Sequence, residues 1–159
     1  MSYSVDYFEN RKLYGQSVII TKSQEKNYGI INDFWKEFNG NIKKFNLSMG
    51  TGGNWEKYGV TYKTGDIYKY FCGIPLEYEY TNDVFTEFKL IGGNYAIFQH
   101  KGAMCNLKIT LFNIYKKIIP ENNLLLNQRE YLHFELYNHK FKWNNKESII
   151  GIYIPINIV

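Results

Sequence analysis

Cysteine is scarce in this sequence, and its few cysteines are far apart. The chain of 159 residues contains 2 cysteines, Cys72 and Cys105, with no CxxC or Cys/His spacing of the kind that binds zinc. Disulfide frameworks need several cysteines and occur mainly in small secreted domains. We therefore expect no disulfide framework, no metal site and no cofactor.

Long apolar runs and runs of basic residues are missing as well. No stretch approaches the length of a membrane span, and residues 1–15 carry charges without the apolar run of a signal peptide. The lysines are scattered, the net charge is only +4, and no nucleic-acid-binding module is recognisable. We expect a cytoplasmic protein that binds neither membranes nor, directly, nucleic acids.

Proline is also rare, with 3 residues, whereas aromatic residues make up 18% of the chain. Such a composition favours strands and argues against disorder. A chain of this length buries a core without cross-links, so we expect one domain over residues 1–159. The run Gly50-Thr-Gly-Gly53 lacks the Lys-Ser/Thr that follows in a phosphate-binding loop, and we assign it no function.

The stretch Glu130–Tyr137 shows two faces of different chemistry at the two-residue period of a strand. One face carries Leu132, Phe134 and Leu136. The other carries Tyr131, His133, Glu135 and Tyr137. The first face suits a core, whereas the second places one carboxylate among aromatic rings. We interpret the second face as the wall of a pocket for an apolar or cationic ligand; the alternative is a solvent-exposed sheet face in a tyrosine-rich chain.

The patterns along the chain predict two helices among many strands. Apolar residues at helical spacing predict helices over about 25–45 and 106–119. Alternating or β-branched runs predict strands at 16–21, 58–63, 67–72, 76–80, 85–91, 94–100, 130–137 and 149–156. Residues 1–14 show no clear period. The repeated order predicts an α+β fold: two pseudo-symmetric strand–helix–strand–strand halves form a mostly antiparallel sheet, with two helices on one face and a ligand cleft on the other.

Several segments together carry a family resemblance that covers about residues 3–157. They are Phe34–Phe38, Tyr58–Val60, Tyr95–Gly102, Ile114-Tyr115 with the exit at Pro120, Phe134–Tyr137 and Ile152–Ile156. In this order they resemble the GyrI-like small-molecule-binding family. The same domain is the effector-binding part of some AraC-type and MerR-type transcription regulators.

The resemblance implies a sheet with two helices behind it and a ligand cleft in front. Members of the family bind bulky, often cationic aromatic compounds, and a carboxylate on the strand similar to Phe134–Tyr137 lies in their cleft. Glu135 matches that position. Some stand-alone members are hydrolases of cyclopropane-bearing natural products. The sequence lacks the DNA-binding helical domain of the regulators, so a role in regulation would require a separate regulator.

The ligand-binding residues that we expect are Glu135, Trp35, Tyr68, Tyr70, Tyr137, Trp143 and Tyr153. A carboxylate at low effective dielectric attracts a cation, and each ring face adds cation–π attraction of roughly 0.5–2 kcal/mol. For each ring taken alone, ordinary core packing is the alternative.

Three functions are compatible with these residues. The preferred one is a stand-alone protein that captures aromatic or cationic compounds for sensing or sequestration. The alternative is a hydrolase in which Glu135 is the general base, with Tyr70 or Tyr137 orienting water and His133 as a second candidate base. The third, contact with DNA gyrase or another protein, has least support, because no long apolar stretch or acidic tail is present. The natural ligand, the occurrence of catalysis and the oligomeric state, a homodimer included, stay open.

Overall fold

The computed structural model describes residues 1–45, 55–75 and 84–158. The strand predicted at 76–80 and the glycine run at 50–53 lie outside these residues. Within the described ranges, no helix is both long and apolar enough to cross a membrane.

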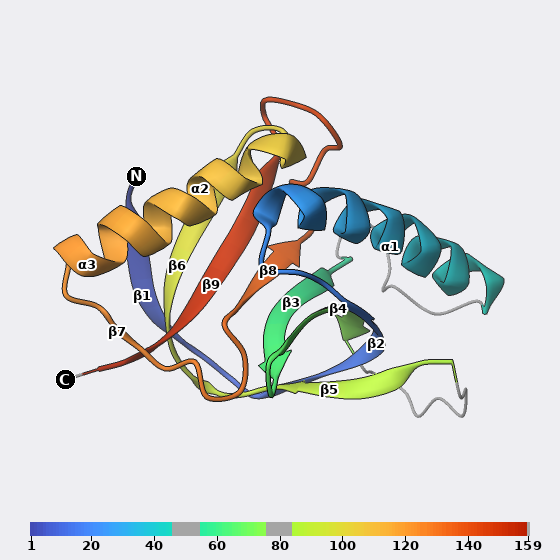
Figure 1. The fold of residues 1–159 in the computed structure, drawn as a ribbon, viewed down its shortest axis with the longest axis horizontal. Helices are drawn as coiled ribbons and strands as arrows, with labels where there is room; N and C mark the ends of the chain where they lie inside the picture. The colour runs from blue at the N-terminus through green and yellow to red at the C-terminus, as the bar shows by residue number, and fades with distance from the viewer. Residues whose placement is uncertain (46–54, 76–83, 159) are drawn as a thin grey trace.

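The described residues form nine strands and two helical segments (Figure 1). The strands are β1 Tyr3–Phe8, β2 Arg11–Ile19, β3 Lys57–Thr64, β4 Ile67–Pro75, β5 Thr86–Leu90, β6 Gly93–Lys101, β7 Leu125–Leu126, β8 His133–Tyr137 and β9 Ile149–Asn157. The first helix is α1, Gln24–Lys44. The second segment joins a 3-10 turn Met104–Asn106, α2 Leu107–Asn113, a π-helical turn Ile114–Ile118 and α3 Ile119–Glu121.

These elements agree with most of the sequence-based predictions. Both predicted helices are present, and each strand predicted within the described residues has a counterpart. The prediction missed β1 and the first part of β2, which lie in the stretch without a clear period. It also missed the short β7 within the loop predicted at 121–129.

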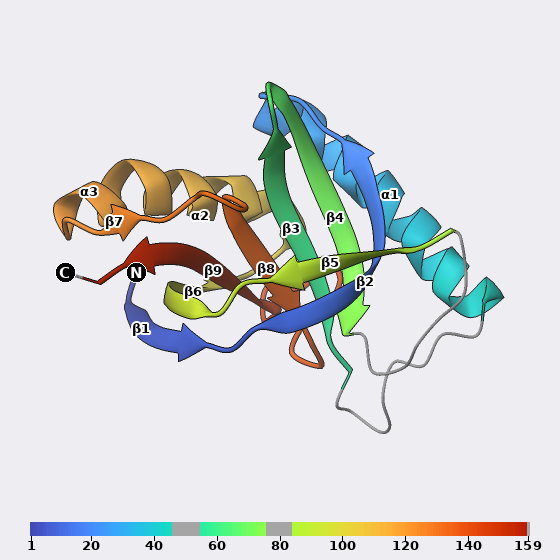
Figure 2. The same cartoon turned by 90° about the horizontal axis from the view of Figure 1, so that it is seen from below.

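The strands form one sheet whose order is symmetric about its centre. The order is β1-β6-β9-β8-β3-β4-β2-β5, all neighbours are antiparallel, and β7 pairs with β9. Each half contains a strand, a helix and two further strands, and the two halves have the same arrangement on either side of the β3–β8 pair. The halves are β2-α1-β3-β4 and β6-α2-β8-β9. Both helices cover the same side of the sheet (Figures 1 and 2). The predicted α+β class and its two pseudo-symmetric halves are confirmed.

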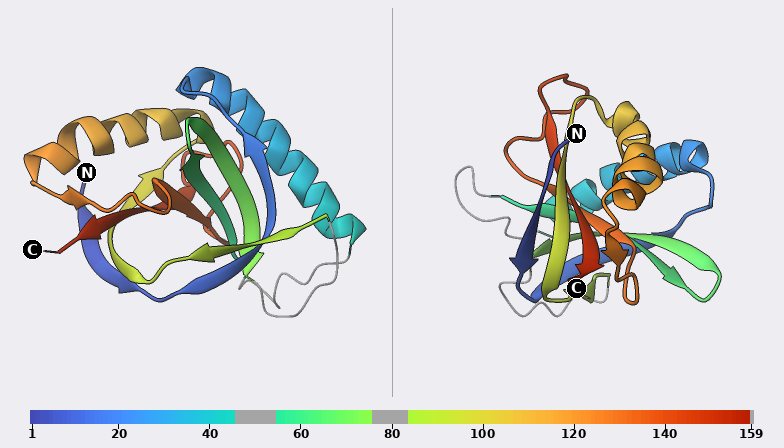
Figure 3. Two further views of the ribbon diagram at one scale, coloured as in Figure 1. Left: turned by 60° about the horizontal axis from the view of Figure 1, so that its bottom comes forward. Right: turned by 90° about the vertical axis from the view of Figure 1, so that its left-hand side faces the viewer.

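The outermost strands are exchanged between the two halves. β1 leads directly into β2 but pairs with β6 of the other half, and β5 leads into β6 but pairs with β2. The two connections meet where the Asn10 side-chain oxygen accepts a hydrogen bond from the Gly92 backbone N–H. Because each edge of the sheet is tied to the opposite half, the sheet curls into a half-barrel (Figure 3).

A small hydrogen-bonded unit sets the direction of α1. The Ser23 hydroxyl accepts from the Lys26 backbone N–H at 3.3 Å and caps the helix. The buried Asn27 side chain accepts from the Thr21 N–H and donates to the Thr21 carbonyl, both at 2.8 Å. These bonds fix the angle between the end of β2 and the helix, which forms one wall of the site described below.

Side chains bury both faces of the sheet. Toward the helices, one apolar cluster around Ile114 and Ile152 lies with α2, and another around Phe38 and Ile74 lies with α1. Inside the curl, a third cluster fills the opposite face with Leu13, Tyr58, Val60, Phe71, Leu90, Tyr95, Tyr131 and Phe134. The ligand cleft was expected on this opposite face. The structure instead places the cavities beside Glu135 and Tyr137 on the helix face, because the exchanged strands curl the other face into a packed core.

Candidate ligand-binding site

Strand β8 directs three polar side chains toward the helices. His133, Glu135 and Tyr137 lie on the helix face, whereas Phe134 and Leu136 pack into the cluster inside the curl. His133, Glu135 and Tyr137 are each no more than 5% exposed. The predicted alternation is therefore correct over β8, and its polar face is buried rather than solvated.

The alternation fails just before β8. Tyr131 was predicted to share the face of Glu135, but its ring contacts Phe134 inside the curl and its hydroxyl lies 2.5 Å from that of Tyr95. Leu132 was predicted to face the core, but it lines the cavity on the helix face. Both predictions are wrong because β8 begins only at His133, so the two-residue period does not extend to residues 131 and 132.

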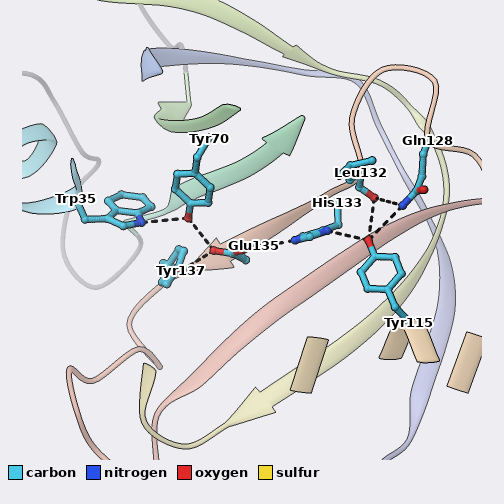
Figure 4. A network of polar contacts seen from close by, with 8 residues as sticks. All are labelled: Trp35, Tyr70, Tyr115, Gln128, Leu132, His133, Glu135 and Tyr137. Carbon is cyan, nitrogen blue, oxygen red and sulfur yellow. Dashed lines mark hydrogen bonds and ion pairs between the residues drawn. The ribbon is translucent and has the colours of Figure 1, made fainter. Parts of the chain in front are cut away.

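Two tyrosines donate to one oxygen of Glu135 (Figure 4). The hydroxyls of Tyr70 and Tyr137 donate to Oε1 at 2.7 and 2.6 Å, and Trp35 Nε1 donates to the Tyr70 hydroxyl at 3.1 Å. Gly59 on β3 makes this approach possible. A Cβ atom at Gly59 would lie 1.8 Å from the Tyr70 hydroxyl oxygen. The Tyr70 ring therefore reaches across β3 to Glu135 only because residue 59 has no side chain.

His133 faces the second oxygen of Glu135 without bonding to it. His133 Nε2 lies 3.9 Å from Oε2, and within the described part of the chain Nε2 has no hydrogen-bond partner. On the other side of the ring, Nδ1 lies 2.8 Å from the Tyr115 hydroxyl, which accepts from Gln128 Nε2 at 3.2 Å. The same hydroxyl donates to the Leu132 carbonyl oxygen at 3.3 Å, so its bond with Nδ1 fits either neutral tautomer, and Nε2 is the ring nitrogen that faces Glu135.

Burial controls the charge of these groups. It raises the pKa of Glu135, and the hydrogen bonds from Tyr137 and Tyr70 oppose that rise. It lowers the pKa of His133 to about 4, so the imidazole is uncharged at neutral pH. Burial also raises the pKa of Tyr70 and of Tyr137 well above the ordinary value, so both phenols remain donors. Among the described side chains, Glu135 thus has no cationic partner.

A cavity of about 470 Å³, cavity 1, lies between α1 and the second helical segment, and Glu135 lies in its wall. The sheet contributes Thr61, Tyr68, His133 and Glu135, and the helices contribute mainly Asn27, Ile31, Leu107, Leu111 and Tyr115. The lysines that line it, Lys22 and Lys108, are exposed. Its size is in the range of small-molecule sites, and its wall combines apolar side chains with a few polar groups.

A second cavity of about 370 Å³, cavity 2, adjoins the first, since both are lined by Asn32 and Met104. Its other lining residues are Trp35, Lys36, Asn39, Trp55, Lys57, Tyr137, Phe141 and Trp143. Aromatic side chains dominate this cavity, whereas cavity 1 contains the carboxylate.

The structure distributes the seven predicted site residues over four places. Glu135 and Tyr68 line cavity 1, and Trp35, Tyr137 and Trp143 line cavity 2. Tyr70 is fully buried and contacts Glu135. Tyr153 is not brought to the site: it lies inside the curl, where its ring stacks on Phe134 at 4.7 Å and 10°. Its strand partner in register is Phe134, so both rings lie on the same face of the sheet.

Sequence reasoning missed four residues with direct roles in this geometry, namely Tyr115, Gln128, Trp55 and Lys57. Tyr115 belongs to the predicted helical stripe, a signal that it faces the sheet. Gln128 lies in a predicted loop, and nothing in the sequence indicates that its amide reaches Tyr115. No group of three or more His, Cys, Asp or Glu side chains suited to a metal ion occurs in the described ranges, 1–45, 55–75 and 84–158.

Comparisons with known proteins give a family match and several similar structures. The family model described as Cass2, integron-associated effector binding protein, matches residues 5–156. A search of curated proteins gives no match. The structure is similar to that of SAV2435 bound to tetraphenylphosphonium, with a TM-score of 0.78 and 16% identity over 99% of this chain and 94% of that chain.

Two further structures have the same fold. An integron cassette protein from the mobile metagenome of Vibrio cholerae has a TM-score of 0.65 and 19% identity, covering 98% of this chain and 95% of that one. A hydrolase from Listeria innocua has a TM-score of 0.53 and 8% identity, covering 98% of this chain and 91% of that one. At these identities, the structural similarities demonstrate the fold alone.

Proposed function

Because the chain belongs to the Cass2 family of integron-associated effector-binding proteins, which is GyrI-like, we propose that it captures bulky aromatic or cationic compounds for sensing or sequestration. The ligand binds in cavity 1, and Glu135 supplies the opposing charge. Effector binding in the family supports a small-molecule ligand in general. The bound tetraphenylphosphonium of SAV2435 supports a lipophilic cation as the first ligand to test.

The observation that carries this proposal is a buried carboxylate with no cation beside it among the described side chains. Ionised carboxylates inside proteins are normally paired, because a charge removed from water without compensation is costly. Glu135 is 4% exposed, and its nearest basic group is the neutral imidazole of His133. Tyr70 and Tyr137 stabilise the ionised form through Oε1 and leave Oε2 for the ligand. A cationic ligand completes this arrangement.

Ring and aliphatic side chains provide the rest of the affinity. Ile31, Leu107 and Leu111 line cavity 1 with Tyr68 and Tyr115, so an aromatic ligand contacts apolar surface on several sides. Apolar contacts are not directional, whereas the charge interaction depends mainly on distance. A site of this kind accepts ligands of different shape, provided that each is apolar and positively charged.

Calorimetric titration with tetraphenylphosphonium tests the proposal. For Glu135→Gln, which keeps the shape and removes the charge, we expect the affinity to fall at least about tenfold, or about 1.4 kcal/mol. The exposed Glu121, at the end of α3, gives the matched control Glu121→Gln, which is expected to bind like the wild type. Triphenylphosphine oxide, a neutral compound of related shape, is expected to bind wild type and Glu135→Gln equally.

Unchanged tetraphenylphosphonium affinity in Glu135→Gln, with the fold intact by circular dichroism, would remove the electrostatic part of the proposal. Absence of binding by the wild type would remove the cation-capture function itself.

A hydrolase is the second candidate, favoured by the Oε2 atom, which accepts no hydrogen bond from the described side chains, and by the raised pKa of Glu135. A carboxylate whose pKa is raised toward neutrality by burial is a stronger base toward water. His133 Nε2 lies across from Oε2 and has no hydrogen-bond partner among the described residues, so it is available to a bound substrate. Mass spectrometry after long incubation with electrophilic cyclopropane compounds tests this candidate. Product that forms with wild type and not with Glu135→Gln supports it, and intact compound with both contradicts it.

A further inference from the structure

All three tryptophans of the chain line cavity 2, although they lie far apart in the sequence. Trp35 comes from α1, Trp55 from the residues before β3, and Trp143 from the loop between β8 and β9. Two edge-to-face ring contacts occur in the wall of the cavity. The ring centroids of Trp35 and Tyr137 are 5.2 Å apart, and those of Tyr137 and Phe141 are 5.1 Å apart. Aromatic side chains from three separate segments therefore line cavity 2.

Cavity 2 differs from cavity 1 in its charged side chains, because the buried carboxylate of Glu135 lies in the wall of cavity 1 alone among the described residues of the two cavities. Among the described residues that line cavity 2, the charged ones are Lys36 and Lys57, and none is Asp or Glu. Lys57 is half-buried, donates from Nζ to the Asn39 side-chain oxygen at 2.6 Å, and lies 5.6 Å from the centre of the Trp55 ring. No carboxylate of the described residues forms an ion pair with it.

An ammonium group in this position has capacity for a further partner. It carries three N–H donors, and Asn39 accepts one of them. Burial removes part of the water around the Lys57 ammonium group. The neutral Asn39 amide and the Trp55 ring face stabilise the charge less well than an anion would. In agreement, burial lowers the pKa of Lys57; the nearby Cys72 opposes this shift, and Lys43 adds to it.

We propose that cavity 2 is a second ligand site that binds flat aromatic anions. The ring lies among Trp35, Trp55 and Trp143, and the carboxylate or sulfonate group binds Lys57, with Lys36 as an additional positive charge. At about 370 Å³, the cavity has the size of a small-molecule site. The two neighbouring cavities thus select ligands of opposite charge, a property separate from the capture of cations beside Glu135.

Tryptophan fluorescence gives a direct readout, because every tryptophan of the chain lines cavity 2. 4-Nitrobenzoate is the probe, and 4-nitrobenzamide is a neutral compound of nearly the same shape. We expect saturable quenching by 4-nitrobenzoate with an affinity at least about tenfold above that of 4-nitrobenzamide, since a charge-assisted hydrogen bond to Lys57 forms only with the anion.

Variants of Lys57 identify the charge responsible. Lys57→Gln is expected to lower the 4-nitrobenzoate affinity at least about tenfold while leaving that of 4-nitrobenzamide nearly unchanged. Lys57→Arg, which keeps the positive charge, is expected to retain most of the anion affinity. The matched control is Lys117→Gln, at an exposed lysine of the second helical segment, with wild-type affinity.

Equal affinity for the anion and the amide overturns the proposal, as does absence of quenching by either compound. Equal 4-nitrobenzoate affinity in wild type and Lys57→Gln also overturns it. Near-ultraviolet circular dichroism checks that the variants keep the tertiary packing. Tetraphenylphosphonium titration of Lys57→Gln, expected to match the wild type, separates this result from the function proposed for cavity 1.

Discussion

The Nε2 atom of His133 lies 3.9 Å from Oε2 of Glu135, too far for a hydrogen bond although both side chains are buried. The imidazole is neutral and the carboxylate is held through its other oxygen, so the pair is not a salt bridge at neutral pH. A ligand or substrate group bound here would contact both Nε2 of His133 and Oε2 of Glu135.

His133 makes stability depend on pH. Its pKa falls from 6.5 in the unfolded chain to about 4 in the folded protein, so only the unfolded state binds the proton between these values. Acidification from pH 6.5 to 4 therefore lowers the free energy of unfolding by up to about 3 kcal/mol through this residue alone. The raised pKa of Glu135 acts in the opposite direction.

Urea denaturation at several pH values isolates the His133 contribution. His133→Gln is expected to show a smaller loss of stability between pH 6.5 and 4 than the wild type. His139→Gln, at an exposed histidine, is the control and is expected to keep the wild-type slope. Parallel curves for wild type and His133→Gln would contradict the assignment.

The two tyrosines beside Glu135 are expected to differ in their importance. Tyr137→Phe removes one donor from Oε1 and is expected to lower the free energy of unfolding by about 1.5–3 kcal/mol, as for hydrogen bonds to charged groups. Tyr70→Phe removes the other donor and also leaves Trp35 Nε1 without its acceptor, so its cost is expected to be larger.

Equilibrium unfolding in urea of the two variants measures this order. Tyr7→Phe, at a tyrosine that is 67% exposed, is the control and is expected to stay within about 0.5 kcal/mol of the wild type. A smaller loss for Tyr70→Phe than for Tyr137→Phe would show that the Trp35 contact contributes no stability.

Gly59 is expected to tolerate no larger residue. In Gly59→Ala, the methyl group would overlap the Tyr70 hydroxyl at 1.8 Å and lie 3.1 Å from Glu135 Oε1, so the phenol must leave the carboxylate. We expect a loss of at least about 2 kcal/mol from overpacking and the broken hydrogen bond, with weaker tetraphenylphosphonium binding.

Gly40→Ala is the matched control for that substitution. Gly40 lies within α1, and a Cβ atom there would meet nothing within 4 Å. The change is expected to raise the free energy of unfolding by about 0.5–1 kcal/mol, because alanine favours helix more than glycine does. Chemical denaturation of both variants compares the two, and similar values would refute the steric argument for Gly59.

Local patterns were sufficient to predict the residues that share a strand face. The alternation over His133–Tyr137 placed Glu135 and Tyr137 together, and the same argument placed Tyr68 with Tyr70. The helical stripe gave α1 to within about a residue at each end. These features depend on the two-residue period of a strand and on the helical period, which the sequence contains directly.

The position of the cavities depended on contacts that no local pattern encodes. Alternation indicates which residues share a face, but not which face the helices cover. The inside of the curl is filled because β1 pairs with β6 and β5 with β2, pairings between distant segments. Trp143 reaches cavity 2 through the path of a loop, and Tyr153 is removed from the site by its register with Phe134.

The exchange of β1 and β5 between the halves also affects how the protein unfolds. Tyr3 lies opposite Phe98, so β6 loses its outer neighbour when the N-terminal residues detach, and β2 loses its outer neighbour when β5 does. We expect that neither half folds after excision, since each would expose an unpaired strand edge prone to aggregation. The internal symmetry therefore does not divide the protein into independent units: the halves are expected to unfold in a single cooperative transition, and loss of order at either edge is transmitted to the opposite side of the ligand site.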